Sequence, residues 1–268
     1  MSQILYEERN GIAYITLNRE EKLNALTPEM VVRMASLWTE IAINNSVRVV
    51  LITGAGNRAF SAGGDLGSLI PIMMQSRPPE DEWEQKLADD RRLLSAALLR
   101  NATFFKPVVA AINGLALAGG MEMLMGTDIR IASQDATFAL TEVRRGLIAS
   151  GGSLVRLPRQ IAWADAMELA LVGEPIDAHH ALRIGLVNRV VPAEEVMAVA
   201  EEFALKISKG APIALAKSKE AMVRSSGRSL EEAFLIESEC TKVNAATHDA
   251  SEGPRAFMEK REPNFLGR

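Results

Sequence analysis

The beginning of the chain shows the alternation of hydrophobic and polar residues that is typical of β-strands. The stretches ILYEE and IAYITLN, within residues 4–18, lie on either side of Asn10-Gly11. Asn-Gly is favoured in tight two-residue turns, so this part of the chain predicts a β-hairpin. Farther along, Thr27-Pro28 combines a favoured N-cap residue with a favoured first helical residue and predicts the start of a helix.

Short apolar runs predict buried strands at residues 47–53 and 107–112, and a further short strand is expected at 129–132 and a strand-like segment at 186–191. Residues 57–64 are polar and contain glycine, which predicts a loop, and a buried helix is expected at 119–126. After Gly152 the pattern is mostly helical, with helices expected at 161–172, 177–184, 193–209, 212–224, 230–246 and 249–260. Alternating strands and helices followed by a helical tail indicate an α/β core in residues 1–195 and a helical subdomain in 196–268.

The composition indicates a globular protein of a reducing compartment. Of the 268 residues 48% are hydrophobic, which suffices for a substantial core. The net charge of −4, with acids and bases interspersed, argues against a nucleic-acid partner. Cys240 is the single cysteine, which excludes an internal disulfide framework. The N-terminus lacks the basic region and long apolar core of a secretory signal, so a cytoplasmic location is expected.

We expect neither a membrane span nor a metal site. The apolar stretch at residues 107–127 is long, but Asn113-Gly114 interrupts it and marks a turn. A strand, a loop and a buried helix explain this stretch better than a span does. His179, His180 and His248 do not form the spacing of a metal-binding motif, and paired cysteines are absent from the sequence.

Isolated glutamates in apolar, glycine-containing segments are the strongest candidates for chemistry. Glu122 is the only charged residue of PVVAAINGLALAGGMEMLMGT, and Glu142 lies in FALTEVRRGLIASGG. A buried carboxylate must lose its charge, find partners or take part in a reaction, and a pair of them suggests acid/base chemistry. Each glutamate also has a structural alternative to acid/base chemistry. Glu122 would cap backbone N–H groups near a helix start, and Glu142 would form a salt bridge with Arg144 or Arg145.

The chain resembles the crotonase superfamily, also called the enoyl-CoA hydratase/isomerase family. The resemblance rests on ordered segments that cover nearly the whole sequence: LNREEKLNAL (17–26), VVLITGAGNRAFSAGGDL (49–66), KPVVAAINGLALAGGMEM (106–123), FALTEVRRGLIASGGSLVRLPR (138–159), IGLVNRVV (184–191) and EGPRAFMEKREP (252–263). It implies an α/β fold with a spiral core of repeated ββα turns and a helical C-terminal subdomain for trimerisation. A homotrimer, or a dimer of trimers forming a hexamer, is therefore expected.

The resemblance also implies a reaction on acyl-CoA thioesters. Gly64 and Gly119 match the positions whose backbone N–H groups form the oxyanion hole, although simple turn geometry would also explain these glycines. Glu122 matches the carboxylate that activates water, and Glu142 matches the one that exchanges a proton with the α-carbon. The implied enzyme is an enoyl-CoA hydratase, a hydro-lyase that adds water reversibly across the C2–C3 double bond.

Further residues match family positions that contact coenzyme A, which enters as part of the substrate, so that a prosthetic group is not needed. Lys22 and Ala25 match positions near the CoA phosphates and adenine. Ala62, Asp65 and Leu66 match the loop along the pantetheine and thioester. Phe257 and Lys260 match a C-terminal helix that reaches a CoA near a subunit boundary.

Departures from the family pattern narrow the reaction. Ser150 stands where branches with dienoyl-CoA isomerase or dehalogenase activity place an aspartate, which argues against those reactions. Gly67 replaces a basic residue of many hydratases, so one phosphate contact is in doubt. The acyl-tail pocket is expected within residues 67–100, where Met73, Met74 and Trp83 either line a tunnel or simply pack.

Alternative functions stay open at this level. A 3-enoyl-CoA isomerase would need Glu142 alone, whereas retention of Glu122 as well favours hydration or its reverse. A non-catalytic acyl-CoA-binding or RNA-binding member is a further alternative. The net negative charge argues against RNA binding, and the presence of both Glu122 and Glu142 argues against a loss of catalysis.

Overall fold

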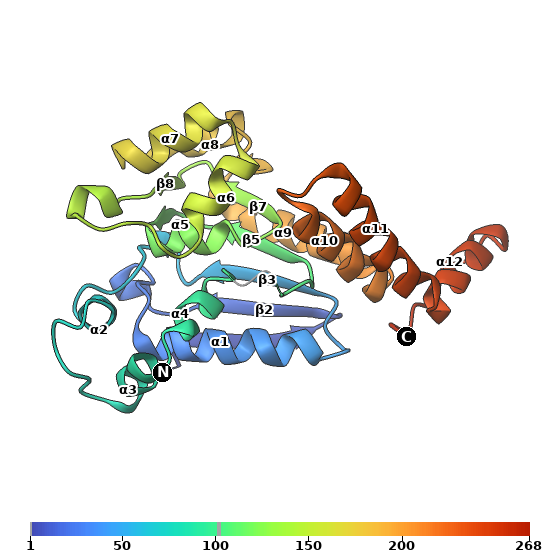
Figure 1. Ribbon diagram of the computed structural model, residues 1–268, viewed down its shortest axis with the longest axis horizontal. Coiled ribbons are helices and arrows are strands. Elements are labelled where there is room, and N and C mark those ends of the chain that lie inside the picture. Colours follow the sequence, from blue (N-terminus) through green and yellow to red (C-terminus); the bar gives the residue numbers. More distant parts are fainter. Residues whose placement is uncertain (1, 101–102) are drawn as a thin grey trace.

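The computed structural model describes residues 2–100 and 103–268. Its larger sheet has the strand order β1-β2-β3-β5-β7-β10 (Figure 1). The antiparallel pair β1/β2 forms one edge, and the strands from β2 to β10 are parallel to one another. The strands span Ile4–Arg9 (β1), Ile12–Leu17 (β2), Val49–Gly54 (β3), Val108–Ile112 (β5), Ile129–Ser133 (β7) and Arg189–Val191 (β10).

A smaller sheet, with the order β4-β6-β8-β9, lies beside the larger one. Its strands span Ala59–Ser61 (β4), Leu115–Leu117 (β6), Thr137–Ala139 (β8) and Ile176–Asp177 (β9). The chain passes from β3 to β4, from β5 to β6 and from β7 to β8, so each turn gives a strand to both sheets. This is a spiral of ββα turns. The predicted loop at 57–64 thus contains β4, and the sequence patterns had not revealed the smaller sheet.

The helices connect and cover these sheets. They span Pro28–Ile43 (α1), Leu69–Met73 (α2), Glu82–Asp89 (α3), Arg92–Ala97 (α4), Gly119–Leu124 (α5), Ser153–Gln160 (α6), Trp163–Val172 (α7), Ala178–Arg183 (α8), Val196–Ser208 (α9), Pro212–Ser225 (α10), Leu230–Ala245 (α11) and His248–Met258 (α12). Short 3₁₀ helices span Glu20–Lys22, Glu142–Arg145 and Ala193–Glu195.

Local signals in the sequence account for the first elements. Asn10 and Gly11 both have positive φ, 53° and 74°, as the predicted hairpin turn requires. Thr27 Oγ1 accepts the N–H of Met30 at 3.2 Å and Pro28 is the first residue of α1, so the predicted helix start is confirmed.

The central strands of the larger sheet, β2, β3, β5 and β7, are buried on both faces, whereas the edge strand β1 is largely exposed. In β3, Val50 and Ile52 belong to the main core, whereas Val49 and Leu51 face a separate apolar cluster. This explains why β3 reads as a continuous apolar run rather than as an alternating one. The second cluster includes Val196, Ala200 and Ala204 of α9, so α9 packs against the sheet. Helix α9 thus packs on the core, although it lies within residues 196–268, the range expected for the C-terminal subdomain.

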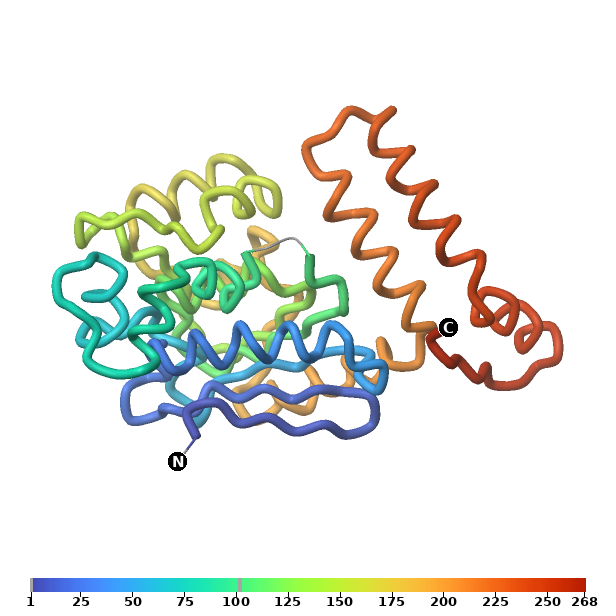
Figure 2. Tube along the Cα trace, turned by 60° about the horizontal axis from the view of Figure 1, so that its bottom comes forward, coloured from blue at the N-terminus to red at the C-terminus, as the bar shows by residue number. Residues whose placement is uncertain are grey.

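Helices α10, α11 and α12 extend away from the spiral core (Figures 1 and 2). α10 and α11 form a helical hairpin, and Lys219 of α10 ties it to the core, because its Nζ donates to Asp128 Oδ2 at 2.7 Å and to the carbonyl of Lys106 at 3.0 Å. Large apolar side chains on these helices are exposed, including Leu230, Phe234 and Phe257. Among the described residues, no helix has the length and apolar character needed to cross a membrane.

Candidate active site

A cavity of about 900 Å³ lies between the first loops of the spiral, helices α2 and α4, the start of α5 and the loop that follows Glu142. Its size is typical of small-molecule sites. The predicted catalytic and oxyanion-hole residues all line it: Gly64, Gly119, Glu122 and Glu142. These residues are separated along the chain by as many as 78 positions, and the spiral brings them to one place.

The start of α5 has an unusual backbone. Ala118, directly before the helix, has φ 46° and ψ −122°, a strained conformation for a residue with a side chain. At Gly120, a Cβ would lie 2.3 Å from the carbonyl oxygen of Ser61, so only glycine lets α5 approach β4 this closely. Strained or tightly packed backbone of this kind often marks a functional site. It sets the position of Glu122 in the first turn of α5.

Glu122 is 6% exposed, and its carboxylate is held by the loop before α6. The backbone N–H of Gly151 donates to Glu122 Oε1 at 2.5 Å. Burial, with the nearby charge of Glu142 as a further cause, raises the pKa of Glu122 to about 7, although the N–H groups of Gly151 and Ser153 oppose this shift. Glu122 thus accepts hydrogen bonds from N–H groups at the start of a helix, α6, as the capping alternative expected. Its raised pKa also allows it to exchange a proton near neutral pH.

Glu142 lies at the start of a 3₁₀ helix and is 9% exposed. Its Oε2 is buried without a hydrogen-bond partner among the described residues. Burial raises the pKa of Glu142, and the charge of Arg145 acts in the opposite direction. The alternative of a structural ion pair is wrong within the described chain, because Arg144 instead binds Glu174 at 2.9 Å and Arg145 donates to the carbonyl of Thr141 at 3.2 Å.

The backbones of Gly64 and Gly119 lie side by side. A Cβ placed on Gly119 would be 3.6 Å from the nitrogen of Gly64 and 3.6 Å from Cα of Gly63. Within the part of the chain that the structure describes, neither Gly64 N–H nor Gly119 N–H donates to another protein group. Positive φ angles do not explain these glycines, since neither has one. Gly119 is also the first residue of α5, where unpaired N–H groups favour negative charge.

These features together allow a defined kind of chemistry. Neighbouring N–H groups can bind an oxygen atom that gains negative charge, and they do so most effectively in a site that excludes water. Buried carboxylates with raised pKa values can give and take protons close to that oxygen. The cavity is thus suited to proton transfers next to a polarised carbonyl group.

Most of the predicted coenzyme A contacts also line the cavity: Lys22, Ala25, Ala62, Asp65 and Leu66. The side chain of Asp65 is, however, engaged within the protein. Its Oδ2 pairs with Arg19 at 2.6 Å, and its Oδ1 accepts the N–H groups of Gly67 and Ser68 at 2.9 Å. Burial alone would raise the pKa of Asp65, but these donors more than offset it and lower the pKa.

Sequence reasoning missed Arg19, which lines the cavity and holds Asp65. No pattern in LNREEKLNAL distinguishes this arginine from a surface residue. Of the residues expected in the acyl pocket, Met73 and Met74 line the cavity. Trp83 instead lies on α3, with the cations of Arg33 and Lys86 over its ring.

Phe257 and Lys260 lie far from the cavity within the same chain. Phe257 is 86% exposed on α12, the outermost helix in Figure 1. A contact between these residues and coenzyme A would have to form across a subunit boundary, and it stays a prediction. In the described residues, no group of three or more His, Cys, Asp or Glu side chains is arranged to hold a metal ion.

Comparisons with known proteins place the chain among proteins of one family. A family model described as enoyl-CoA hydratase/isomerase matches residues 7–268. (E)-benzylidenesuccinyl-CoA hydratase of Thauera aromatica is 36% identical over 264 residues, covering 98% of this chain and 99% of that protein. Enoyl-CoA hydratase EchA19 of Mycobacterium tuberculosis is 37% identical over 264 residues, covering 98% of this chain and 96% of that one.

The fold has close counterparts among solved structures. The crystal structure of an enoyl-CoA hydratase from Bacillus anthracis superposes with a TM-score of 0.88 at 34% identity, covering 100% of both chains. The predicted fold class, a spiral α/β core followed by C-terminal helices, is confirmed by this match.

Proposed function

Because the chain belongs to the enoyl-CoA hydratase/isomerase family, we propose that it is an enoyl-CoA hydratase. The reaction is the reversible addition of water across the C2–C3 double bond of a 2-enoyl-CoA thioester. The observation that carries the proposal is that Glu122 and Glu142 share one cavity with the N–H groups of Gly64 and Gly119, which have no acceptor in the described part of the chain.

The proposed mechanism assigns one task to each group. Ionised Glu122 accepts a proton from water as the water oxygen bonds to C3, and the π electrons move toward the thioester oxygen. The N–H groups of Gly64 and Gly119 donate to this oxygen as it becomes negative, a contribution on the order of 3 kcal/mol for each donor. Protonated Glu142 then gives its proton to C2, and exchange with solvent returns the proton from Glu122 to Glu142.

The hydrogen bonding of each carboxylate favours this distribution of protons, whereas burial and the charge of Glu142 act against ionised Glu122 and raise its pKa to about 7. Glu122 accepts a hydrogen bond from Gly151 N–H, which stabilises its ionised form. Glu142 Oε2 has no donor among the described residues, so its neutral form is favoured. Since two charges cannot easily coexist in a buried site, the pair holds a shared proton near neutral pH.

The test is direct. Purified protein is incubated with crotonyl-CoA, and loss of the conjugated thioester absorbance is followed. We expect turnover that is reversed when 3-hydroxybutyryl-CoA is supplied instead. If short, medium-length and branched 2-enoyl-CoA thioesters all stay unchanged while the protein remains folded, the proposal is wrong.

The partnerless oxygen of Glu142 also supports a second candidate, isomerisation of a 3-enoyl-CoA. A single carboxylate can move a proton between C2 and C4, so Glu122→Gln would then keep activity on that substrate. A non-catalytic acyl-CoA-binding or RNA-binding role has less support, because buried carboxylates that face a cavity cost stability and are typical of catalytic sites. Tight CoA binding without turnover of any thioester would favour that role.

Binding of coenzyme A and self-association belong to the same proposal. Lys22, at the cavity edge, is suited to the CoA phosphates, and Ala62 and Leu66 to the pantetheine. The exposed apolar side chains of α10–α12 are suited to a trimer interface, in which Phe257 and Lys260 would approach the CoA of a neighbouring subunit. Analytical ultracentrifugation tests the assembly, and a monomer at micromolar concentration would contradict it.

A further inference from the structure

Arg130 of β7 is a cation buried in the core beside α5. It is 6% exposed, and it lies two residues before Ala132 of the main core, so both side chains point to the same side of the sheet. Burial lowers the pKa of Arg130 to about 10, which leaves the guanidinium charged at neutral pH. In the described part of the chain, its side-chain hydrogen bonds all go to neutral oxygen atoms. A buried charge without a contacting counter-charge is costly, so these oxygen atoms have to compensate for it.

Most of these oxygen atoms lie at the C-terminal end of α5. Arg130 Nε donates to the carbonyl of Leu124, the last residue of α5, at 2.9 Å, and Nη2 donates to the carbonyl of Thr127 at 3.1 Å. Thr127 Oγ1 accepts from Nε at 3.3 Å and itself donates to the carbonyl of Leu124 at 2.7 Å. A cation is favourable next to the last carbonyls of a helix, which carry a partial negative charge. Arg130 therefore holds the far end of the helix whose first turn contains Glu122.

The same guanidinium reaches the C-terminal end of α6. Its Nη2 donates to Oε1 of Gln160, the last residue of α6, at 2.8 Å. Gln160 Nε2 in turn donates to the carbonyl of Met125, directly after α5, at 3.0 Å. Arg130 Nη1 completes the set with the carbonyl of Leu186 at 2.9 Å. Arg130 and Gln160 thus tie the C-terminal ends of α5 and α6 to each other.

The opposite ends of these two helices meet at the carboxylate of Glu122. Glu122 lies in the first turn of α5, and its Oε1 accepts the N–H of Gly151, just before α6, at 2.5 Å. The N–H of Ser153, the first residue of α6, also binds this carboxylate. At about 1.5 Å per residue, helices of six and eight residues are only about 9 and 12 Å long. The two helices therefore form a small closed frame, joined at one end by Glu122 and at the other by Arg130 and Gln160.

We propose that Arg130, together with Gln160, is a positioning residue for Glu122. From the far ends of α5 and α6 it fixes where the carboxylate stands relative to the N–H groups of Gly151 and Ser153. In the described chain Arg130 lies outside the lining of the cavity, so it acts through the two helices and not on the substrate. The inference rests on the proposed function, in which Glu122 accepts a proton from water. A purely structural Arg130 would stabilise the fold without affecting the hydrogen bond of Glu122.

The experiment opens the frame at its far end with Gln160→Leu. This substitution removes the link between the helices but leaves the bonds of Arg130 to α5, and it falls on an exposed residue, where effects on stability are small. Nuclear magnetic resonance gives two readouts that need no turnover: the amide shift of Gly151 and the titration of the Glu122 carboxyl carbon, which is the signal absent from Glu122→Gln.

In Gln160→Leu we expect the Gly151 amide to lose the shift of a hydrogen-bonded group. The pKa of Glu122 should rise by about half a pH unit or more, because donors to its ionised form are weakened. The kcat for crotonyl-CoA hydration should fall by about tenfold with little change in KM. Gln160→Glu keeps an acceptor for Arg130 and should stay closer to wild type in all three measurements. Arg130→Lys keeps the charge but not the planar set of donors, and should have at least the effect of Gln160→Leu.

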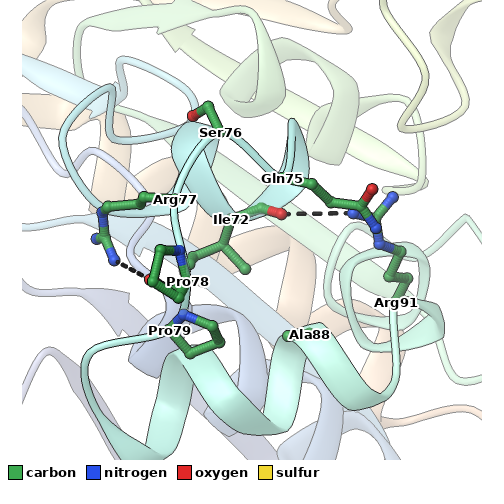
Figure 3. A pocket seen from close by; sticks show the side chains of 8 residues that line it. All are labelled: Ile72, Gln75, Ser76, Arg77, Pro78, Pro79, Ala88 and Arg91. Atoms are coloured by element: carbon green, nitrogen blue, oxygen red, sulfur yellow. Dashed lines mark hydrogen bonds between the residues drawn. The ribbon is translucent and has the colours of Figure 1, made fainter.

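Two control variants separate positioning from other effects. Arg91 also donates to the last carbonyls of a short helix beside the cavity, those of Ile72 at 3.4 Å and Met73 at 3.1 Å in α2, where it borders a second hollow of about 450 Å³ (Figure 3). Because α2 does not carry Glu122, Arg91→Gln should leave the pKa of Glu122 and kcat near their wild-type values. Val109→Ala leaves a cavity on the α9 side of the sheet, so it lowers stability without touching the frame, and the pKa of Glu122 should again be unchanged.

The outcomes are distinct. A folded Gln160→Leu protein with the wild-type Gly151 shift and the wild-type pKa of Glu122 would overturn the positioning role. Equal changes in Val109→Ala would also overturn it, because they would reflect a general loss of stability. Since both resonance readouts are independent of hydration, the expected shifts together with no turnover of any 2-enoyl-CoA would support the frame and reject the hydratase.

Discussion

Gly151 donates its backbone N–H to Oε1 of Glu122 at 2.5 Å, and it is also the residue whose missing side chain makes room for that carboxylate. A Cβ at position 151 would lie 2.7 Å from Glu122 Oε2 and 2.5 Å from Leu98 Cδ1. Because Gly151 follows Glu142 in the same connecting segment, one loop sets the relative placement of both carboxylates.

Gly151→Ala should therefore displace the carboxylate of Glu122. We expect kcat for crotonyl-CoA hydration to fall by about 100-fold, the usual effect of a small misplacement of a catalytic group, while KM changes little. Steady-state kinetics with a folded variant, as judged by circular dichroism, is the measurement.

Gly253→Ala serves as the control for a glycine substitution. Gly253 lies within α12, and a Cβ there would meet Phe265 at an ordinary 3.6 Å. We expect kcat within about twofold of wild type. A Gly151→Ala enzyme with equally full activity would mean that the contact between Gly151 and Glu122 has no part in catalysis.

Glu122→Gln should make the protein more stable above neutral pH. The pKa of Glu122 rises from 4.5 to about 7 on folding, so the unfolded chain releases this proton first and folding is increasingly disfavoured between those values. Below pH 4.5 the group is neutral in both states and the penalty disappears. We expect the substitution to raise the free energy of unfolding by about 1 to 3 kcal/mol at pH 8 and by much less at pH 5.

Urea denaturation of wild type and Glu122→Gln at both pH values measures this difference. Glu82→Gln is the matched control, because Glu82 is exposed on α3, and this variant should have the same free energy of unfolding as wild type at each pH value. A Glu122→Gln protein less stable than wild type at pH 8 would show that the ionised carboxylate stabilises the fold instead of straining it.

Arg19→Met should weaken substrate binding more than it slows the chemical step. Arg19 holds Asp65, which organises the loop after Gly64 and the start of α2. We expect KM for crotonyl-CoA to rise by about tenfold with a smaller change in kcat, and stability to fall by about 1 kcal/mol for this partly exposed pair. Arg33→Met, which breaks the exposed pair with Glu29, should leave both kinetic constants unchanged. Equal effects of the two substitutions would contradict the role given to Arg19.

Several elements were predictable because their signals are local. The Asn10-Gly11 turn, the cap at Thr27 and the apolar runs of β3 and β5 each specify their structure over a few residues. The strands of the smaller sheet escaped notice because they are two or three residues long, too short to show alternation. Helix α6 was also missed, since Pro158 interrupts its pattern.

The residues of the candidate site also differ in whether the local sequence indicates them. Glu122 and Glu142 could be found as lone charges in apolar segments, and Gly64 and Gly119 through the family resemblance. The contact from Gly151 and the ion pair of Arg19 join segments that are distant in sequence, so no local pattern indicates them. The packing of α9 on the sheet likewise depends on which face of the sheet is left uncovered.

The most direct test of the account is the rate of crotonyl-CoA hydration by wild type, Glu122→Gln, Glu142→Gln and the double variant. Because both carboxylates act in one proton-transfer sequence, each single substitution should lower kcat by about 1,000-fold, and the double variant should be slower than either by less than about tenfold. All four proteins should still bind butyryl-CoA. A single variant that retains hydration within about tenfold of the wild-type rate would contradict the joint role of Glu122 and Glu142.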